Sequence, residues 1–261
     1  MCIRDSTLSG EIIRQKDFSW NASLLYAFNR NKVKHISVQP SLWDSRISMP
    51  TSYLMVGKPL YGIYAYKWAG LNENGDPQVY DAENNVTSGP ARDYHALVYC
   101  GTTVPIHNAS LTNVLRYKGL EFSAMLILDA GHKLRSSNIP SINMSNGRIT
   151  STAKGIVDRW TQPGDVTDVP RLLFSNDTEN FNTHRTELYR YSDLFVYDAS
   201  NIRLSNISLA YRVPAHWCKK ISLSGARLQF NVENVATFAF DSKANYDLGG
   251  KVKPNYVWGL Y

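Results

Sequence analysis

Apolar and polar residues alternate along several stretches of this chain, most clearly over residues 226–234. There Ala226, Leu228, Phe230 and Val232 fall on one side, and the residues between them are polar. A repeat of two residues is the geometry of a β-strand with one apolar face and one polar face. The same alternation predicts strands at 8–14, 20–30, 105–117, 120–130, 197–211 and 223–238, and from 254 onward. We therefore predict an all-β fold with about seven antiparallel strands.

One of these stretches changes phase in its middle. Within 197–211 the apolar positions are even-numbered up to Leu204 and odd-numbered from Ile207 onward. A β-bulge inserts one extra residue into a strand and so returns both sets to the same face. We expect such a bulge near Ser205–Asn206.

The predicted strands are joined alternately by short and long connections. Short turns are expected near 16, 118 and 215, and long loops at 33–103, 132–193 and 239–253. We expect Gly119 to supply the positive φ of the turn near 118, and Asn74-Gly75 to form a tight turn inside the first long loop. Outer-membrane barrels combine short periplasmic turns with long extracellular loops, whereas sandwich strands are shorter and more closely spaced. The pattern favours part of a transmembrane antiparallel β-barrel with long extracellular loops.

The composition agrees with a barrel but does not exclude every alternative. Aromatic residues make up 12% of the chain and charged residues only 19%, which suits the aromatic girdles of membrane barrels. Sugar-binding sandwiches are also rich in aromatic residues, so a secreted carbohydrate-binding or adhesin β-domain stays as the alternative. No stretch approaches the ~18 apolar residues of a membrane helix.

In the barrel interpretation, the apolar face of each strand meets lipid. The positions assigned to that face are Trp20, Leu24, Tyr26, Phe28, Leu111, Leu115, Phe122, Leu126, Leu128, Leu209, Tyr211, Leu228, Phe230, Val232, Trp258 and Leu260.

The sequence carries no motif for catalysis. It lacks a nucleophile elbow, a phosphate-binding loop, a dinucleotide fingerprint and a zinc-protease motif. Three widely spaced cysteines indicate neither a zinc site nor a disulfide framework. The net charge is +6, but Lys and Arg are scattered rather than clustered, which argues against nucleic-acid binding. We expect a protein that is not an enzyme and has no cofactor or metal.

Two features of the long loops allow a sharper interpretation. Asn72, Asn74, Asp76 and Glu83 follow the spacing of a calcium loop, but Pro77 stands where glycine is required, so we favour an ordinary turn. Aromatic loop residues are candidates for stacking on substrate, although packing within the loops is the simpler explanation. These candidates are Tyr61, Tyr64, Tyr66, Trp68 and Trp160.

Several segments, in their order and spacing, resemble the SusC/RagA-like TonB-linked outer-membrane transporters of Bacteroidetes. The resemblance covers nearly the whole chain from Lys16 onward and corresponds to the C-terminal part of the barrel. The matching segments are Phe18–Val33, Gly57–Gly62, Ala69–Tyr80, Tyr117–Phe122, Arg159–Asp165 with Pro170–Arg171, and Asp198–Pro214.

The resemblance implies a location in the Gram-negative outer membrane and the import of large nutrients, either oligosaccharides or peptides. It implies a SusD-like surface lipoprotein as partner, contact with outer-membrane lipid and lipopolysaccharide, and energy from the TonB complex acting through a plug domain. A complete barrel of this kind has about 22 strands around a plugged lumen. The segment in hand would supply barrel wall, lumen lining and extracellular loops.

We expect both ends of this sequence to be truncated. Residues 1–6 resemble translated adapter sequence and form a non-native leader, so residues 7–261 are expected to be the partial barrel without its plug and N-terminal strands. Family members usually end in an outward-facing aromatic residue. Here Trp258 and Leu260 are expected to face outward and Tyr261 inward, which suggests that about three residues of the final strand are missing.

Overall fold

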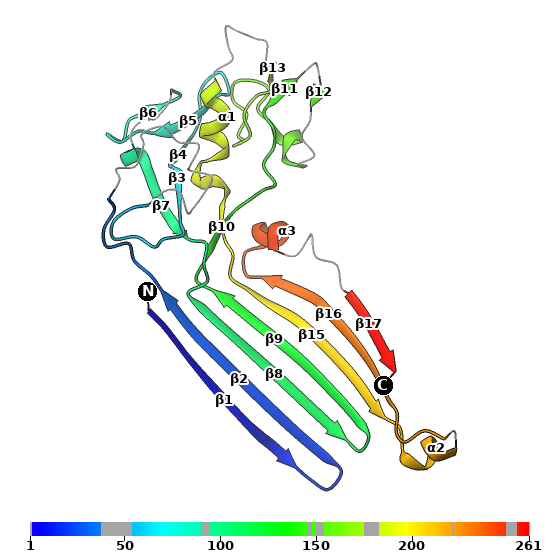
Figure 1. Ribbon diagram of the computed structural model, residues 1–261. Helices are drawn as coiled ribbons and strands as arrows, with labels where there is room; N and C mark the ends of the chain where they lie inside the picture. Colours follow the sequence, from blue (N-terminus) through cyan, green and yellow to red (C-terminus); the bar gives the residue numbers. More distant parts are fainter. Residues whose placement is uncertain are drawn as a thin grey trace. The chain divides into compact units, whose positions relative to one another are not determined.

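Figure 1 shows the computed structural model of the chain, which describes residues 2–37, 54–89, 94–145, 148–149, 154–174, 183–220, 222–248 and 255–260. The chain divides into two compact units. The first contains Met1–Asn31, Pro105–His132 and Asp198–Tyr261, and the second contains Lys32–Val104 and Lys133–Tyr197.

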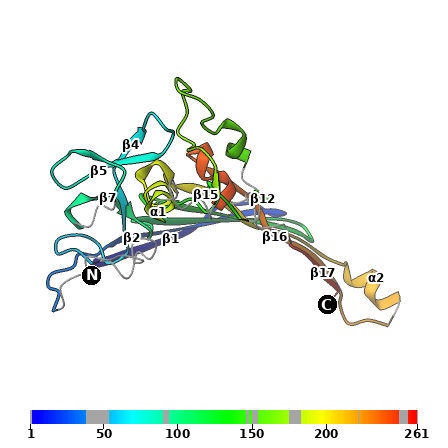
Figure 2. The same ribbon diagram turned by 90° about the horizontal axis from the view of Figure 1, so that it is seen from above.

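The first unit is built on one antiparallel sheet of seven strands, as the alternation predicts. The strands lie in the order β1 (Cys2–Arg14), β2 (Phe18–Arg30), β8 (His107–Tyr117), β9 (Leu120–Ala130), β15 (Asn201–Arg212), β16 (Arg227–Ala239) and β17 (Asn255–Leu260). Figure 2 shows this sheet nearly edge-on, as a single layer. Each strand pairs with the next strand of this sheet in the sequence, even where a long connection separates the two, so the sheet is a simple meander.

The predicted bulge in β15 is confirmed. The register of β15 shifts between Leu204 and Asn206 against both of its neighbours, β9 and β16. Ser205 is the extra residue, and it returns Ile207 and the apolar residues after it to the face of Leu204. A second shift interrupts the pairing of β1 with β2 between Glu11 and Ile13.

The three connections at one end of the sheet are the shorter ones, but one of them is longer than predicted. Residues 213–226 contain a helix, α2 (Ala215–Lys220), so β16 begins at Arg227 rather than at Leu223. The helix buries Cys218, and the amide of Leu223 donates to the Cys218 carbonyl at 3.0 Å, which ends the helix. Residues 223–226 are therefore needed to lead the chain from α2 back to the sheet.

The turn between β8 and β9 uses its glycine in an unexpected way. Lys118, not Gly119, has the positive φ, at 53°. A Cβ atom at Gly119 would lie 2.8 Å from the carbonyl oxygen of Arg212, whose own amide donates to the Gly119 carbonyl at 2.8 Å. Glycine is required here because two backbones approach closely.

The second unit consists of short elements from the two long connections. Its strands are β3 (Gly62–Tyr66) paired with β7 (Leu97–Thr102), the sheet β4 (Trp68–Leu71), β5 (Pro77–Tyr80) and β6 (Val86–Thr87), and the sheet β12 (Arg148–Ile149), β11 (Asn143–Ser145) and β13 (Leu173–Phe174). β10 (Lys133–Arg135) pairs with β14 (Val196–Asp198). The helices are α1 (Thr183–Arg190), η2 (Tyr94–Ala96), η3 (Lys154–Asp158) and η4 (Asp193–Phe195), while η5 (Ser242–Ala244) and α3 (Asn245–Leu248) belong to the first unit.

The sequence suggested long loops without regular structure here. The structure shows instead that these connections have a hydrophobic core of their own. One buried cluster joins Tyr66, Val79 and Leu188, and another joins Ile142, Tyr189 and Phe195. Trp68 packs against both clusters. No helix among the described residues has the length and apolar character that a membrane-crossing helix needs.

The close approach at Gly119 gives a first prediction. Gly119→Ala should destabilise the β8–β9–β15 corner by about 1–3 kcal/mol, because backbone atoms must move to admit the methyl group. Gly225→Ala is the matched control, since an added Cβ there meets nothing within 4 Å. Thermal unfolding of both variants checks this, and equal midpoints would contradict it.

Candidate functional site

The register of the sheet gathers the apolar side chains into ladders that cross neighbouring strands. Leu24 pairs with Leu8 on one side and Leu111 on the other, and Leu111 pairs with Leu126. Leu126 in turn pairs with Leu204. Directly paired residues of an antiparallel sheet point to the same face, so this ladder runs along one face of five strands.

A second ladder lies parallel to the first, nearer the short connections. It runs through Trp20, Leu115, Phe122, Leu209 and Phe230 across five strands, and β17 adds Tyr256, whose ring lies 6.4 Å from that of Phe230. The same registers place fourteen of the sixteen positions predicted to meet lipid, those on β2, β8, β9, β15 and β16, on this one face. The bulge at Ser205 is what allows β15 to contribute to both ladders.

This apolar face is left open over the described residues. The side chains of Leu24, Leu209 and Phe230 are each 43% exposed, and Leu126 is 37% exposed. Leucine and phenylalanine are usually buried in soluble proteins, and a large contiguous apolar patch marks contact with a membrane or another protein. A face that stays apolar over seven strands therefore needs an apolar environment.

Aromatic residues mark both ends of the apolar face. At the end of β2 that leads into a long connection, Tyr26 Oη lies 2.8 Å from His107 Nδ1, and the ring of Phe28 lies 5.4 Å from that of His107. At the other end β2 begins with Phe18, which pairs with Tyr117. Ten residues at roughly 3.4 Å each span ~34 Å, or ~26 Å when the strand tilts by ~40°, close to the ~25 Å apolar band of membrane barrels.

The opposite face of the sheet is polar. Asn108 Nδ2 donates to Asp129 Oδ1 at 2.6 Å, and Arg203 lies 3.7 Å from the same carboxylate. Gln229 Nε2 donates to Ser208 Oγ at 3.3 Å. These cross-strand hydrogen bonds and ion pairs suit a face that water reaches.

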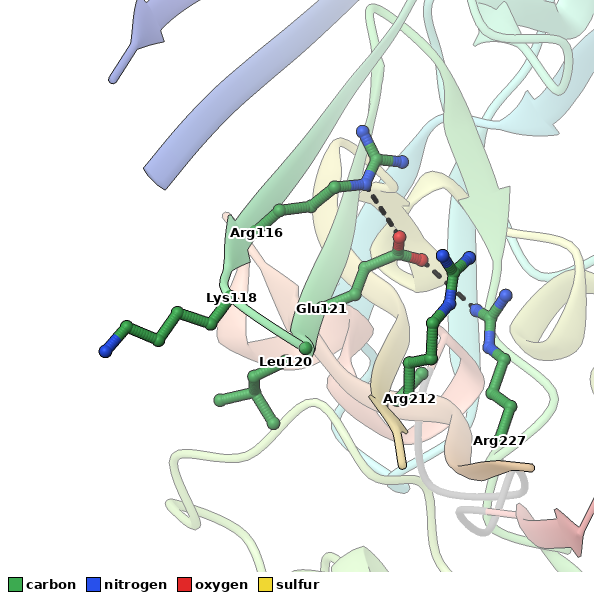
Figure 3. A pocket seen from close by; sticks show the side chains of 8 residues that line it. Arg116, Lys118, Leu120, Glu121, Arg212 and Arg227 are labelled. Atoms are coloured by element: carbon green, nitrogen blue, oxygen red, sulfur yellow. Dashed lines mark hydrogen bonds and ion pairs between the residues drawn. The ribbon is translucent and has the colours of Figure 1, made fainter. Parts of the chain in front are cut away.

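Sequence reasoning missed a basic cluster on this polar face, beside the turn between β8 and β9 (Figure 3). Arg116, Arg212 and Arg227 surround Glu121 there. Arg116 and Glu121 flank the Lys-Gly turn in the sequence, which is a signal for a cross-strand pair. The contribution of the other two arginines depends on which strands pair, and alternation does not give that.

The structure divides the five aromatic candidates for substrate contact. Tyr64 and Tyr66 are core residues, only 1% and 7% exposed, and burial raises the pKa of Tyr64 to about 12. Their rings do not lie on the surface. Tyr61 is 36% exposed, and Trp68 and Trp160 are partly exposed.

The two tryptophans also hold the second unit together. Trp68 Nε1 donates to Asp168 Oδ1 at 2.9 Å, and its ring lies 5.8 Å from that of Tyr189. The ring of Trp160 covers Gly75, since a Cβ at Gly75 would clash with Trp160 Cδ2. Packing within the second unit thus explains most of the contacts of both tryptophans. Tyr61 has the most accessible of the five rings.

Asp76, which the calcium-loop spacing singled out, is an anchor for two arginines. Its carboxylate lies 2.8 Å from Arg171 Nη2 and 3.2 Å from Arg185 Nε. Arg185 also donates to the carbonyls of Ile142 and Arg171, at 3.1 and 2.7 Å. Burial lowers the pKa of Arg185 and the charge of Asp76 opposes that shift.

The residues with calcium-loop spacing form the ordinary turn that the sequence favoured. The side-chain oxygen of Asn72 accepts hydrogen bonds from the amides of Asn74 and Asp76, both at 2.9 Å, which forms the predicted turn with Gly75 at φ 75°. Two guanidinium groups already neutralise the Asp76 carboxylate. Within the described ranges, no group of three or more His, Cys, Asp or Glu side chains is placed to hold a metal ion.

The described thiols do not form a reactive site. Cys100 and Cys218 are free cysteines, partly and fully buried. Burial is the main cause that raises the pKa of Cys100 to about 11. That thiol stays protonated at neutral pH and is a weak nucleophile.

The buried ion cluster in the second unit gives a second prediction. Asp76→Asn should destabilise that unit by about 3–5 kcal/mol, because Arg185, 2% exposed, loses its carboxylate. Faster limited proteolysis within 54–89 and 133–145 of the intact protein would show this. Glu73→Gln, an exposed neighbour, is the control, and equal cleavage rates in both variants would contradict the prediction.

The chain is similar in sequence to two receptors of Formosa agariphila. It is 24% identical over 275 residues to TonB-dependent receptor P3, a match that spans 97% of this chain and 26% of the receptor. It is 25% identical over 232 residues to TonB-dependent receptor P26, spanning 82% of this chain and 22% of the receptor. The chain thus spans about a quarter of the length of these relatives, and no family model matches it.

Solved structures of a transporter share the fold. The RagAB peptide transporter superposes on 98% of this chain with a TM-score of 0.71 and 20% identity, and the match covers 28% of the RagAB chain. The RagAB peptide importer in its open-open state gives a TM-score of 0.68 with the same coverage. The resemblance drawn from the sequence is confirmed: this chain is similar over nearly its whole length to TonB-dependent receptors of the SusC/RagA type and has the all-β fold of part of their barrel.

Proposed function

We propose that this chain forms barrel wall, lumen lining and extracellular loops of a TonB-dependent importer of large nutrients in a Gram-negative outer membrane. The observation that carries the proposal is the exposed apolar face that crosses all seven strands, opposite a polar face. In a barrel wall the apolar face meets lipid and the polar face meets the lumen. A soluble carbohydrate-binding domain would have to cover the apolar face.

In this proposal residues 7–261 are one part of a larger barrel. Within the described residues, β1 and β17 each pair with only one strand, and unpaired strand edges are otherwise sites of aggregation. Relatives about four times as long as this chain have room for the remaining strands and for a plug.

The proposed substrates are oligosaccharides or peptides. Two of the three connections at one end of the sheet form the second unit, and in a barrel with short periplasmic turns that end faces outward. There the ring of Tyr61, together with parts of Trp68 and Trp160, would stack on sugar rings or peptide groups. A SusD-like lipoprotein would cover the outer mouth, lipopolysaccharide would surround the barrel, and the TonB complex would act through the plug.

Extraction tests the proposed location directly. The full-length receptor that contains this chain should fractionate with the outer membrane and leave it only when detergent is added. Its band should also shift on an electrophoresis gel when the sample is boiled, because barrels resist detergent until they are heated. A receptor that dissolves in buffer without detergent would favour the alternative hypothesis, a soluble β-domain.

Charge on the lipid face should impair assembly. Leu126→Arg and Phe230→Arg should each cost about 2–4 kcal/mol if these residues lie near the bilayer midplane. Ser208→Arg is the control because Ser208 lies on the polar face of the sheet, paired with Ser123 and Asn231. The fraction of heat-shifting barrel in the membrane is the measurement, and equal fractions for all three variants would overturn the lipid-face assignment.

Tyr61 is the best single test of substrate contact. Tyr61 is 36% exposed, and its backbone carbonyl accepts from the Thr103 amide at 2.9 Å, a hydrogen bond that a side-chain substitution retains. Tyr61→Ala should weaken substrate binding roughly 2- to 10-fold, equivalent to about 0.5–1.5 kcal/mol of ring stacking. Tyr117→Ala, at the opposite end of the sheet, is the control, and uptake that falls equally in both variants would argue against contact.

A further inference from the structure

Three arginines from three strands converge on one glutamate beside the turn between β8 and β9 (Figure 3). Arg116 Nε donates to Glu121 Oε2 at 2.8 Å, and Arg227 Nη2 donates to Glu121 Oε1 at 3.2 Å. Both oxygens of the carboxylate are therefore engaged. We call Arg116, Arg212 and Arg227 around Glu121 the arginine cluster.

Arg212 is the arginine that this glutamate does not satisfy. The register places Arg212 directly opposite Arg227, and like charges directly opposite in a sheet repel each other. Figure 3 shows the Arg212 guanidinium beside the contact of Glu121 with Arg227. Over the described ranges no ion pair of Arg212 is found, so three guanidinium groups share one carboxylate and an excess of two positive charges remains.

The cluster lines an accessible hollow. Its volume is about 140 Å³, and its floor includes Gly119 and Ala210, which leave room above the backbone. The side chains of Arg116 and Arg227 are 51% and 42% exposed. An incoming acidic group could reach them without displacing any part of the sheet. Lys118, which is also at the hollow, points its amine away from the three arginines (Figure 3).

We propose that the arginine cluster binds carboxylate side chains of an acidic protein segment lying inside the barrel. Guanidinium groups recognise carboxylates through paired, charge-assisted hydrogen bonds, so three arginines with one internal glutamate leave capacity for a further carboxylate. This inference rests on the proposed function, which places the polar face of the sheet in the lumen.

The position of the cluster points to a segment of the receptor rather than to lipid or substrate. Glu121 pairs with Ala210 on the polar face, while the next residue, Phe122, lies on the apolar face, so the cluster faces away from lipid headgroups. It also lies at the end of the strands where the short connections are, and the long connections leave from the other end of the strands. The match to TonB-dependent receptor P3 covers 26% of that receptor, so such a chain has residues left for a segment inside the lumen as well as for the remaining strands.

Carbodiimide cross-linking of the intact receptor in detergent tests the proposal. Arg212→Lys keeps the positive charge and supplies an amine that carbodiimide joins to a carboxylate in direct contact. We expect a cross-link from position 212 to an Asp or Glu outside residues 1–261, located by mass spectrometry. The amine of Lys118, which points away from the cluster, is the control within the same molecule and should not join that Asp or Glu.

A second variant removes the internal competitor. Glu121→Gln, combined with Arg212→Lys, should abolish any cross-link within the cluster and leave the cross-link to the other segment in place. If position 212 joins only Glu121 in the single variant, and the double variant gives no cross-link, the arginine cluster serves the sheet alone and the proposal is overturned.

The outcome is separable from that of the proposed function. A receptor that assembles as a heat-shifting membrane barrel but gives no cross-link from position 212 would keep the proposed function and remove this inference. A receptor that never enters the membrane would remove both.

Discussion

The structure of the first unit depends on the register of its seven strands. Backbone pairing alone would allow neighbouring strands to slip by one residue, but every such slip would turn the apolar side chains of a strand to the opposite face. The leucine ladder through Leu24, Leu111 and Leu126 shows that the register holds across long gaps in the sequence. The bulge at Ser205 corrects the one strand whose pattern changes phase. Two chemically opposite faces follow from this register, and so does the proposed place in a membrane.

The second unit is held together in a different way. Its strands are two to six residues long, too short to stabilise a sheet alone. Instead Arg185, almost fully buried, bonds to Asn143 at the start of β11, to the residues before β13 and to the turn that contains Asp76. A buried guanidinium is energetically costly without a carboxylate, so the pairing of Arg185 with Asp76 determines which segments of the second unit lie together. Aromatic packing around Trp68 then fills the spaces between the short elements.

The two ends of the polar face carry side chains of different chemistry. Toward the long connections it carries amide and carboxylate groups that bond to each other, such as Asn108 with Asp129. Toward the short connections the positive charge of the arginine cluster exceeds what Glu121 neutralises. In the proposed receptor, the positively charged end of this face would bind an acidic segment of the protein, in addition to the role of the sheet in separating lipid from water.

The sequence by itself determined the elements whose signal is local. Alternation with a period of two located the seven strands, the phase change located the bulge, and Asn74-Gly75 located a turn. It also carried the resemblance to the receptors, because the order of weak motifs survives in the chain. Only the tertiary structure decided that Tyr64 and Tyr66 are buried, that α2 precedes β16, and that Arg212 lies opposite Arg227. These features depend on contacts between residues far apart in the chain, and a local pattern holds no information about which distant strand or loop will pack against it.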